Sequence, residues 1–271
     1  MNTTPPSIFS TEGDAALRAL LSERALVAFD FDGTLAPIVE LPPLARLHPE
    51  VERLLRELAE RIRVAIVSGR GIADLRARAD ISSIRLIGNH GNDALLGDSD
   101  EAVQARRTMA DWRARLQREI DRRFGPDGGV EIEDKQATLS LHYRRAADPA
   151  AAERALHEIV AALDPSARTI GGKFVLNVLP PGARTKLEAL AELAAEMGVS
   201  RVAFVGDDVT DEIVFAAAPS DWLTIRVEPE GPTRARFSLA SQHQVARLIE
   251  RMIELLSSPD GSGEPTASRS S

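Results

Sequence analysis

The chain has 271 residues, of which 44% are hydrophobic and 27% charged, a composition typical of a soluble globular protein with room for two domains. Its net charge of −8 argues against nucleic-acid and membrane-surface partners, because such proteins bind phosphates through basic patches. The absence of cysteine excludes disulfides and thiolate catalysis, and neither a membrane-length apolar run nor an export leader is visible, so we expect a cytoplasmic protein.

The first hundred residues alternate between apolar strands and amphipathic helices. The stretch ALVAFDFDGTL, residues 25–35, predicts a strand that ends where Gly33 and Thr34 break it. A helix with Pro49 in its first turn follows, and RVAIVSGR and IRLIGNHG then predict two further strands. Strand–helix–strand units build parallel sheets, so we predict an α/β fold with a doubly wound, Rossmann-like parallel sheet.

The pattern changes between residues 98 and 180. A long charged helix is expected at Asp100–Phe124 and a second helix at Pro149–Leu163. The segment VEIEDKQATLSLHYR predicts two antiparallel strands with a tight turn near Gln136, and ARTI with GGKFVLNVLP predicts a second strand pair. Because parallel-type elements resume afterwards, this segment is predicted to be an inserted small α+β domain.

The remaining elements complete the parallel sheet. We expect a helix at Thr185–Met197, strands in RVAFVGDDVTDE and WLTIRV, a TRAR loop and a last helix at Gln242–Leu256. The predicted core therefore comprises residues 11–97 and 181–256, and the insert residues 98–180. Residues 1–10 and 257–271 are predicted to be disordered.

Chemically active side chains follow the predicted strands at their carboxyl ends, which meet at one edge of a parallel sheet. They are Asp30, Asp32, Ser68, Arg70, Asp207, Asp208 and Asp211, with Lys186 at a helix start. Clustered carboxylates repel one another unless a cation joins them, and an all-oxygen donor set favours Mg²⁺. A hydroxyl and an ammonium beside that cation suit a phosphoryl group. Locally, each residue could instead be a helix cap, a turn residue or an exposed helix start.

One face of the predicted inserted sheet is polar. Period-two counting places Glu131, Glu133 and Lys135 on one face of their strand and Ser140, His142 and Arg144 on one face of the next. Lys173 and Asn177 fall together on the last strand, and only three of the 33 basic residues are lysines. This face is either a solvated surface or a cap that closes over the active site and reads sugar hydroxyls.

The motifs DFDGTL, SGR and GDDVTDE, with a lysine between the last two, resemble those of the haloacid-dehalogenase-like phosphatases. GNHG, EDKQATLSLHYR, GGKFVLNVLP and WLTIRV with TRARFSL more narrowly resemble the trehalose-6-phosphate phosphatases. The resemblance spans about residues 27–255 and implies an inserted cap domain. It also implies Mg²⁺-dependent hydrolysis of trehalose 6-phosphate to trehalose and phosphate, with a trehalose-phosphate synthase as a possible pathway partner.

The resemblance also implies residue roles. Asp30 would attack phosphorus to form an aspartyl-phosphate, and Asp32 would serve as acid and then base. Ser68 and Lys186 would hold the phosphoryl group. The metal would bind Asp30, the backbone carbonyl of Asp32, Asp207 and Asp211. The substrate-binding positions would be Gly69, Arg70, Asn89, His90 and Gly91, with Glu133, Lys135, His142, Arg144, Lys173 and Asn177 in the insert.

Two positions depart from the pattern of that family. Asn177 stands where a Glu is usual, and Thr185, Lys186 and Leu187 replace an Asp-Lys-Gly-like motif. An amide can bond a hydroxyl but cannot act as an anion, so the sugar specificity is open. The alternatives are a related phosphatase of sucrose phosphate or of mannosyl- or glucosyl-phosphoglycerate, a signalling receiver domain, and a non-catalytic phosphosugar sensor.

Overall fold

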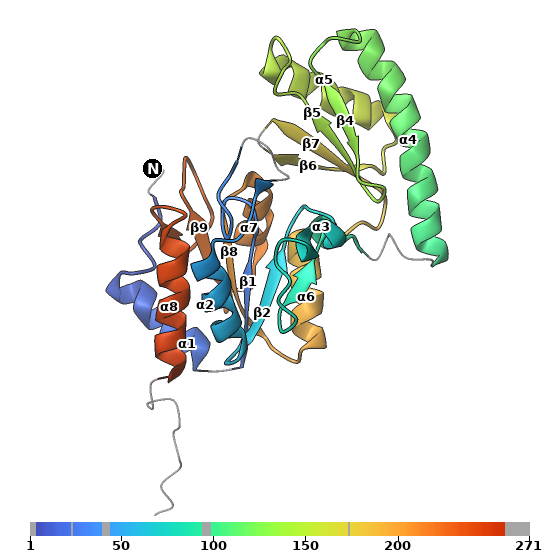
Figure 1. Ribbon diagram of the computed structural model, residues 1–271. Coiled ribbons are helices and arrows are strands. Elements are labelled where there is room, and N and C mark those ends of the chain that lie inside the picture. The colour runs from blue at the N-terminus through green and yellow to red at the C-terminus, as the bar shows by residue number, and fades with distance from the viewer. Residues whose placement is uncertain (1–3, 23, 40–43, 94–98, 173, 258–271) are drawn as a thin grey trace, which may run out of the picture.

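The computed structural model describes residues 4–22, 24–39, 44–93, 99–172 and 174–257, and these form two β-sheets with flanking helices (Figure 1). The strands of the larger sheet are β1 (Ala25–Phe29), β2 (Arg63–Val67), β3 (Arg85–Ile87), β8 (Arg201–Gly206), β9 (Leu223–Val227) and β10 (Phe237–Leu239). They are all parallel and lie in the order β10-β9-β8-β1-β2-β3. The predicted parallel α/β sheet is therefore confirmed.

Helices cover both faces of this sheet. The side chains of β1 alternate between two cores: Val27 and Phe29 pack into one, Leu26 and Ala28 into the other. Burial of a Leu or Phe side chain stabilises the fold by about 2 kcal/mol, so both helix layers are held by apolar packing. The first core includes α1 (Thr11–Leu21), α2 (Pro49–Ala59) and α8 (Gln244–Ser257), and the second includes α6 (Lys186–Glu196) and α7 (Glu212–Ala217).

The segment before α1 differs from its prediction. Residues 5–8 run beside β10, where Ser238 donates its amide to the Pro6 carbonyl and Ile8 donates its amide to the Ser238 carbonyl. Ile8 is fully buried, so the predicted disorder is wrong for these residues. The strand β10 itself was not predicted, because three residues beside a loop carry no readable period. The tail from residue 258 lies outside the described residues.

The second sheet lies between β3 and α6 in sequence. Its helices α4 (Asp100–Phe124) and α5 (Pro149–Leu163) have the predicted bounds, because Ser99 and Asp148 cap their first turns and Pro149 starts the second. The strands are antiparallel in the order β4-β5-β7-β6. Their bounds are β4 (Glu131–Asp134), β5 (Leu139–His142), β6 (Arg168–Gly172) and β7 (Val175–Leu179). Residues 98 and 180 stay predictions as domain boundaries.

The two faces of the second sheet differ in character. Leu139, Leu141 and Leu176 pack against Trp112 of α4 and Leu156 of α5 in an apolar core. The opposite face carries Glu133, Ser140 and Asn177, which the strand register places side by side. The predicted division into an apolar and a polar face is confirmed for these strands.

The polar face meets the carboxyl end of the parallel sheet. Strand β6 contacts η4 (Val209–Asp211), the short helix that follows β8. A Cβ on Gly172, at the end of β6, would lie 3.8 Å from Oδ2 of Asp208. The second sheet thus lies over the edge where the acidic residues were predicted to gather (Figure 1). Among the described residues, no helix combines the length and apolar character needed to cross a membrane.

Candidate active site

Three aspartates meet at the carboxyl ends of β1 and β8. Asp30 follows β1, Asp207 follows the adjacent parallel strand β8, and Asp211 ends η4. One carboxylate oxygen of each lies within 4.8 Å of the others. Asp30 is 5% exposed and Asp211 is fully buried. The structure therefore brings together the three predicted metal-ligating carboxylates, which we call the acidic cluster.

Lys186, the first residue of α6, bridges two members of the acidic cluster. Its Nζ lies 2.7 Å from Oδ1 of Asp211 and 3.1 Å from Oδ1 of Asp30. Burial lowers the pKa of Lys186, but the two carboxylates outweigh burial and raise the pKa above its usual value, so Lys186 is charged. The side chain is 3% exposed, which excludes the reading of an exposed helix start.

The protein's own groups leave the acidic cluster short of positive charge. Burial raises the pKa of Asp30 well above its usual value despite Lys186, and the neighbouring Asp211 and Asp207 raise it further. Burial and the charge of Asp211 raise the pKa of Asp207 to about 7, against the hydrogen bond from Thr34. A divalent cation would remove this deficit, and three carboxylates form the hard, all-oxygen donor set that Mg²⁺ prefers. The residues present therefore fit the predicted metal.

Gly33 and Thr34, which directly follow Asp32, position the carboxylate of Asp207. Thr34 Oγ1 donates to Asp207 Oδ1 over 2.8 Å. Gly33 has φ of +79°, and a Cβ there would lie 2.0 Å from Oδ2 of Asp207, so only glycine admits this carboxylate. Sequence reasoning treated Thr34 as a strand breaker and missed this role. A hydroxyl directly after an Asp-Gly pair at a strand end is the signal that indicates it.

Asp211 serves two partners with its two oxygens. Oδ1 accepts from Lys186, and Oδ2 accepts from the backbone amide of Asp208 over 3.0 Å. A Cβ on Gly206 would lie 2.3 Å from Oδ2, so the backbone approaches this carboxylate closely. The local role in a helix start and the role in the acidic cluster therefore coexist in one side chain.

The carboxylate of Asp32 is paired with Arg70, whereas that of Asp30 is paired with Lys186. Arg70 binds both of its oxygens, Nε to Oδ2 and Nη2 to Oδ1, each over 2.6 Å. The same guanidinium donates to Asp74 over 2.8 Å and is 11% exposed. This two-pronged geometry is the strongest form of an arginine–carboxylate pair. The predicted metal contact of Asp32 through its carbonyl stays a prediction.

Ser68 and the loop after β3 line the neighbouring strand ends. Ser68 follows β2, is 1% exposed, and its Oγ accepts from the amide of Arg70 over 3.1 Å. The ring of His90 packs over Gly69, since a Cβ there would lie 2.6 Å from the ring. Asn89, His90 and Gly91 form the 3₁₀ turn η2, with φ of +47°, +55° and +101°. Asn89 donates from its side chain to Asp93 over 2.9 Å.

The pKa of His90 responds to burial and to positive charges from two parts of the molecule. Burial lowers its pKa well below the usual value, and the charges of Lys186 and of Lys135 lower it further. The imidazole is therefore neutral, under the influence of Lys186 at the start of α6 and of Lys135, which directly follows β4. The contact between β6 and η4 brings the second sheet beside the acidic cluster in the same region.

The predicted residues on the second sheet bond mainly to one another. Glu133 lies 2.9 Å from His142 Nε2 and 3.8 Å from Lys135 Nζ. Asn177 accepts from Ser140 Oγ over 2.7 Å and donates to the carbonyl of Ile170 over 3.3 Å. Arg144 follows the end of β5, and its guanidinium lies 5.5 Å from the ring centroid of Phe174. Lys173 lies outside the described residues.

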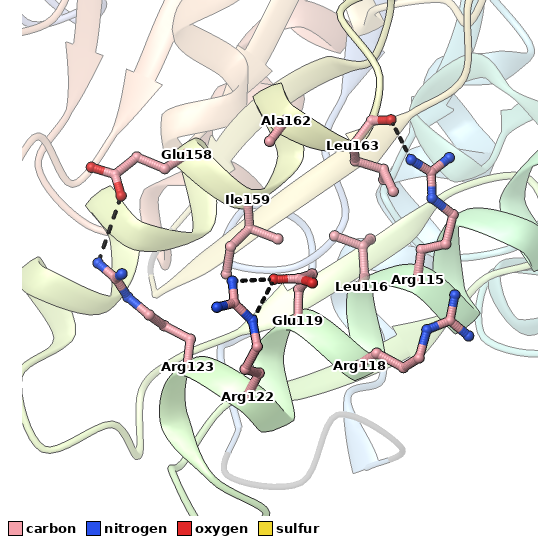
Figure 2. A pocket seen from close by; sticks show the side chains of 10 residues that line it. All are labelled: Arg115, Leu116, Arg118, Glu119, Arg122, Arg123, Glu158, Ile159, Ala162 and Leu163. Atoms are coloured by element: carbon pink, nitrogen blue, oxygen red, sulfur yellow. Dashed lines mark hydrogen bonds and ion pairs between the residues drawn. The ribbon is translucent and has the colours of Figure 1, made fainter.

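A hollow of about 460 Å³ lies between α4 and α5 (Figure 2). Two ion pairs lie at its rim: Arg122 with Glu119 over 2.6 Å, and Arg123 with Glu158 over 3.7 Å. The two helices cover the apolar face of the second sheet, and none of the predicted site residues that the structure describes lines the hollow. The hollow is therefore separate from the candidate active site.

A family model described as trehalose-phosphatase matches residues 28–256 of the chain. A trehalose-phosphate phosphatase from Mycobacterium tuberculosis (strain H37Rv) is 31% identical over 251 residues, covering 88% of this chain and 63% of that protein. An uncharacterized glycosyl hydrolase from the same organism is 29% identical over 252 residues, covering 87% of this chain and 19% of that protein. The chain thus spans less than two thirds of these curated relatives.

Solved structures with the same fold are similar along almost the whole chain. An Aspergillus fumigatus trehalose-6-phosphate phosphatase has a TM-score of 0.67 at 26% identity, covering 93% of this chain and 99% of that one. The C-terminal domain of a Candida albicans trehalose-6-phosphate phosphatase has a TM-score of 0.72 at 22% identity, covering 94% and 99%. At that identity the second likeness shows the fold alone.

Proposed function

Because the chain belongs to the trehalose-phosphatase family, we propose that it hydrolyses trehalose 6-phosphate to trehalose and phosphate with the help of Mg²⁺. The observation that carries this proposal is the acidic cluster at the carboxyl edge of the parallel sheet: Asp30 and Asp211 are buried, Asp207 is partly buried, and the buried Lys186 bridges the first two. A buried carboxylate bridged to a fixed ammonium suits attack on a phosphoryl group, whose charge the ammonium offsets.

Asp30 is the proposed nucleophile. One of its oxygens forms a bond to phosphorus while the bond from phosphorus to the sugar oxygen breaks, and water then hydrolyses the aspartyl-phosphate. Lys186 holds Oδ1 of Asp30 at 3.1 Å, which fixes the direction of the carboxylate. Ser68, at the end of the adjacent strand β2, is the proposed partner of a phosphoryl oxygen.

Mg²⁺ in the acidic cluster would neutralise the phosphoryl oxygens and help orient the phosphorus for in-line attack. Asp207 and Asp211 would hold it together with Asp30, as their shared position supports. Thr34 keeps Asp207 directed into the cluster through its 2.8 Å hydrogen bond. Loss of a support of this kind typically lowers metal affinity by about 10- to 100-fold.

Asp32 is the proposed acid and base. It must deliver a proton to the leaving sugar oxygen, whereas the Arg70 guanidinium occupies both of its oxygens in this structure. Arg70 therefore has to release Asp32 during the reaction, and Asp74 offers it a second partner at 2.8 Å. The incoming phosphate competes for the same guanidinium, which gives Arg70 its proposed role in substrate binding.

The polar face of the second sheet is the proposed sugar-reading surface. Glu133, Lys135 and His142 are charged or polar, partly exposed and mutually bonded, so they can exchange those bonds for sugar hydroxyls. The side-chain amide of Asn177 is already hydrogen-bonded to Ser140 and to the carbonyl of Ile170. No anion stands at that position, so the alternative is a related sugar phosphatase that acts on sucrose phosphate or on a mannosyl- or glucosyl-phosphoglycerate.

A panel of phosphosugars with phosphate release as the readout tests the assignment. We expect the highest kcat/KM for trehalose 6-phosphate, with activity lost on chelation and restored by Mg²⁺. Equal or better turnover of sucrose phosphate or of a glycosyl-phosphoglycerate would refute the trehalose assignment and leave the phosphatase chemistry in place. The absence of any turnover, with phosphosugar binding intact, would identify a sensor.

A further inference from the structure

Asn92 joins the two places where the chain leaves and re-enters the parallel sheet. It follows η2 after β3, the last strand before the second sheet, and it is 2% exposed. Its Oδ1 accepts the amide of Arg184 over 2.7 Å, and its Nδ2 donates to the Arg184 carbonyl over 3.0 Å. The side chain thus pairs with both backbone groups of a residue 92 positions away.

The orientation of this amide follows from its partners. The Arg184 amide can only donate, so the atom facing it is the oxygen, and the nitrogen faces carbonyls alone. The second carbonyl is that of Asn89, at 2.9 Å from Nδ2. Asn92 therefore uses both donor hydrogens and one acceptor, with no alternative flip that satisfies these groups.

We call the hydrogen bonds of Asn92 to Arg184 and to Asn89 the clasp. Each of its two partners lies next to a candidate active-site residue. Arg184 lies two residues before Lys186, and Thr185 between them caps α6 in a capping box with Glu188. Asn89 begins the η2 turn, whose three left-handed residues hold His90 over Gly69. Backbone in this region is unfavourable for non-glycine residues and persists only where its surroundings hold it.

The same junction is packed from two further sides. A Cβ on Gly91, where φ is +101°, would lie 2.4 Å from Cβ of Ala189, so η2 lies directly on α6. From the second sheet, Arg168 of β6 donates to the Ala183 carbonyl over 2.5 Å and lies 3.7 Å from Glu188. The start of α6 is therefore held by the core loop and by the second sheet together.

We propose that Asn92 is a positioning residue that sets Lys186 against Asp30 by clasping the backbone of Arg184 to the turn containing Asn89 and His90. The inference deepens the proposed function, because it takes Lys186 as the cation of a phosphoryl-transfer site. No substrate atom contacts Asn92 in this proposal. It acts through the position of Lys186, and the second sheet reaches the same helix start through Arg168.

The test is a double-mutant cycle between Asn92→Ala and Lys186→Ala. With p-nitrophenyl phosphate, a small ester that needs no sugar recognition, we expect Asn92→Ala to lower kcat about tenfold or more with a smaller change in KM. In the Lys186→Ala background the further loss should be under about twofold, because the group that Asn92 positions is gone. Where turnover is too slow, calorimetric binding of inorganic phosphate with Mg²⁺ gives the same cycle.

Two more variants keep the test decisive. Asn92→Asp retains the acceptor for the Arg184 amide but sets an oxygen against two carbonyls, so it should reproduce the loss if Asn92→Ala does not fold. Glu192→Ala is the matched control. Glu192 lies on α6 and is the exposed ion-pair partner of the Arg184 side chain, so its removal leaves the hydrogen bonds of Asn92 intact. This control should retain full activity.

Two results would overturn the proposal. One is an Asn92→Ala variant with a lowered Tm but an unchanged kcat when it is assayed below its Tm. The other is a double mutant whose loss of kcat equals the product of the two single losses. Failure of the proposed function is seen separately. In that case the wild-type protein does not hydrolyse trehalose 6-phosphate, while the cycle on the small ester or on phosphate still reports the coupling of Asn92 to Lys186.

Discussion

The molecule holds two groups of charged residues, and they differ in how water reaches them. In the acidic cluster, Asp30 and Asp211 are at most 5% exposed, as is Lys186, which bridges them, and Asp207 is partly buried. On the second sheet, the side chains of Glu133 and His142 are 50% and 45% exposed. Charges that are buried interact strongly and stay fixed, whereas exposed pairs are screened and exchange partners readily. The first group suits one fixed reaction, and the second suits recognition of hydroxyl groups.

The largest expected effect lies in the buried group. Asp30→Asn removes the proposed nucleophile at nearly constant volume, and we expect turnover to fall by about 10³-fold or more while trehalose 6-phosphate still binds. Phosphate release and calorimetry measure the two properties. The exposed loop variant Asp221→Asn serves as the control and should match the wild-type protein. An unchanged rate in Asp30→Asn would exclude this residue as the nucleophile.

The next effect separates the two groups directly. Glu133→Ala removes the partner of His142 and Lys135, and we expect kcat/KM for trehalose 6-phosphate to fall roughly 30-fold with little change for p-nitrophenyl phosphate. The matched control is Glu131→Ala. This residue lies two positions earlier on the same face of β4, and its side chain pairs with Arg145. Equal losses on both esters would count against a sugar-reading surface.

A smaller effect tests how the metal ligands are supported. Thr34→Val keeps the shape of the side chain and removes the hydrogen bond to Asp207, and we expect Mg²⁺ affinity to fall about tenfold. The Mg²⁺ concentration that gives half-maximal activity measures this change. Thr169→Val, an exposed position on β6, is the control. An unchanged Mg²⁺ requirement would mean that Thr34 only shapes the turn.

The smallest effect concerns the rim of the buried group. Hydrogen bonds from Arg78 and Arg70 outweigh burial and lower the pKa of Asp74 to about 2, below its unfolded value, so this carboxylate stabilises the fold above about pH 4. That contribution is lost as the pH falls through about 2. The side chain is 43% exposed, so solvent screening limits the contribution. We expect Asp74→Asn to cost about 1 kcal/mol at pH 7 and about half of that at pH 3.

Urea unfolding at the two pH values measures the Asp74 effect. A cost that does not depend on pH would assign the loss to packing and not to charge.

Much of the fold could be predicted because its signals are local. Pro149 and the caps Ser99 and Asp148 lie within a few residues of the helix starts that they set. The alternation of β1 between two cores follows from five consecutive apolar residues. The strand β10 was missed because three residues carry no readable period, and the order in residues 5–8 was missed because it depends on a pairing with the distant Ser238.

The site was predicted as a set of residues and not as a set of bonds. The acidic cluster followed from the rule that parallel strands end together, which brings Asp30 close to Asp207 and Asp211. The rule does not state that Arg70 occupies both oxygens of Asp32, that Thr34 directs Asp207, or that Asn92 clasps Arg184. Nor could it indicate that Asn177 is engaged by Ser140.

By itself, the sequence determined which faces are apolar, where helices begin, and which acids and cations reach one edge of the parallel sheet. These properties depend on residue type and period, and the chain carries both within short windows. Only the tertiary structure decided which oxygen faces which nitrogen, because a hydrogen bond requires a separation near 3 Å and a defined direction. Partners 38 to 173 residues apart meet those conditions only once both layers of helices and both sheets are packed.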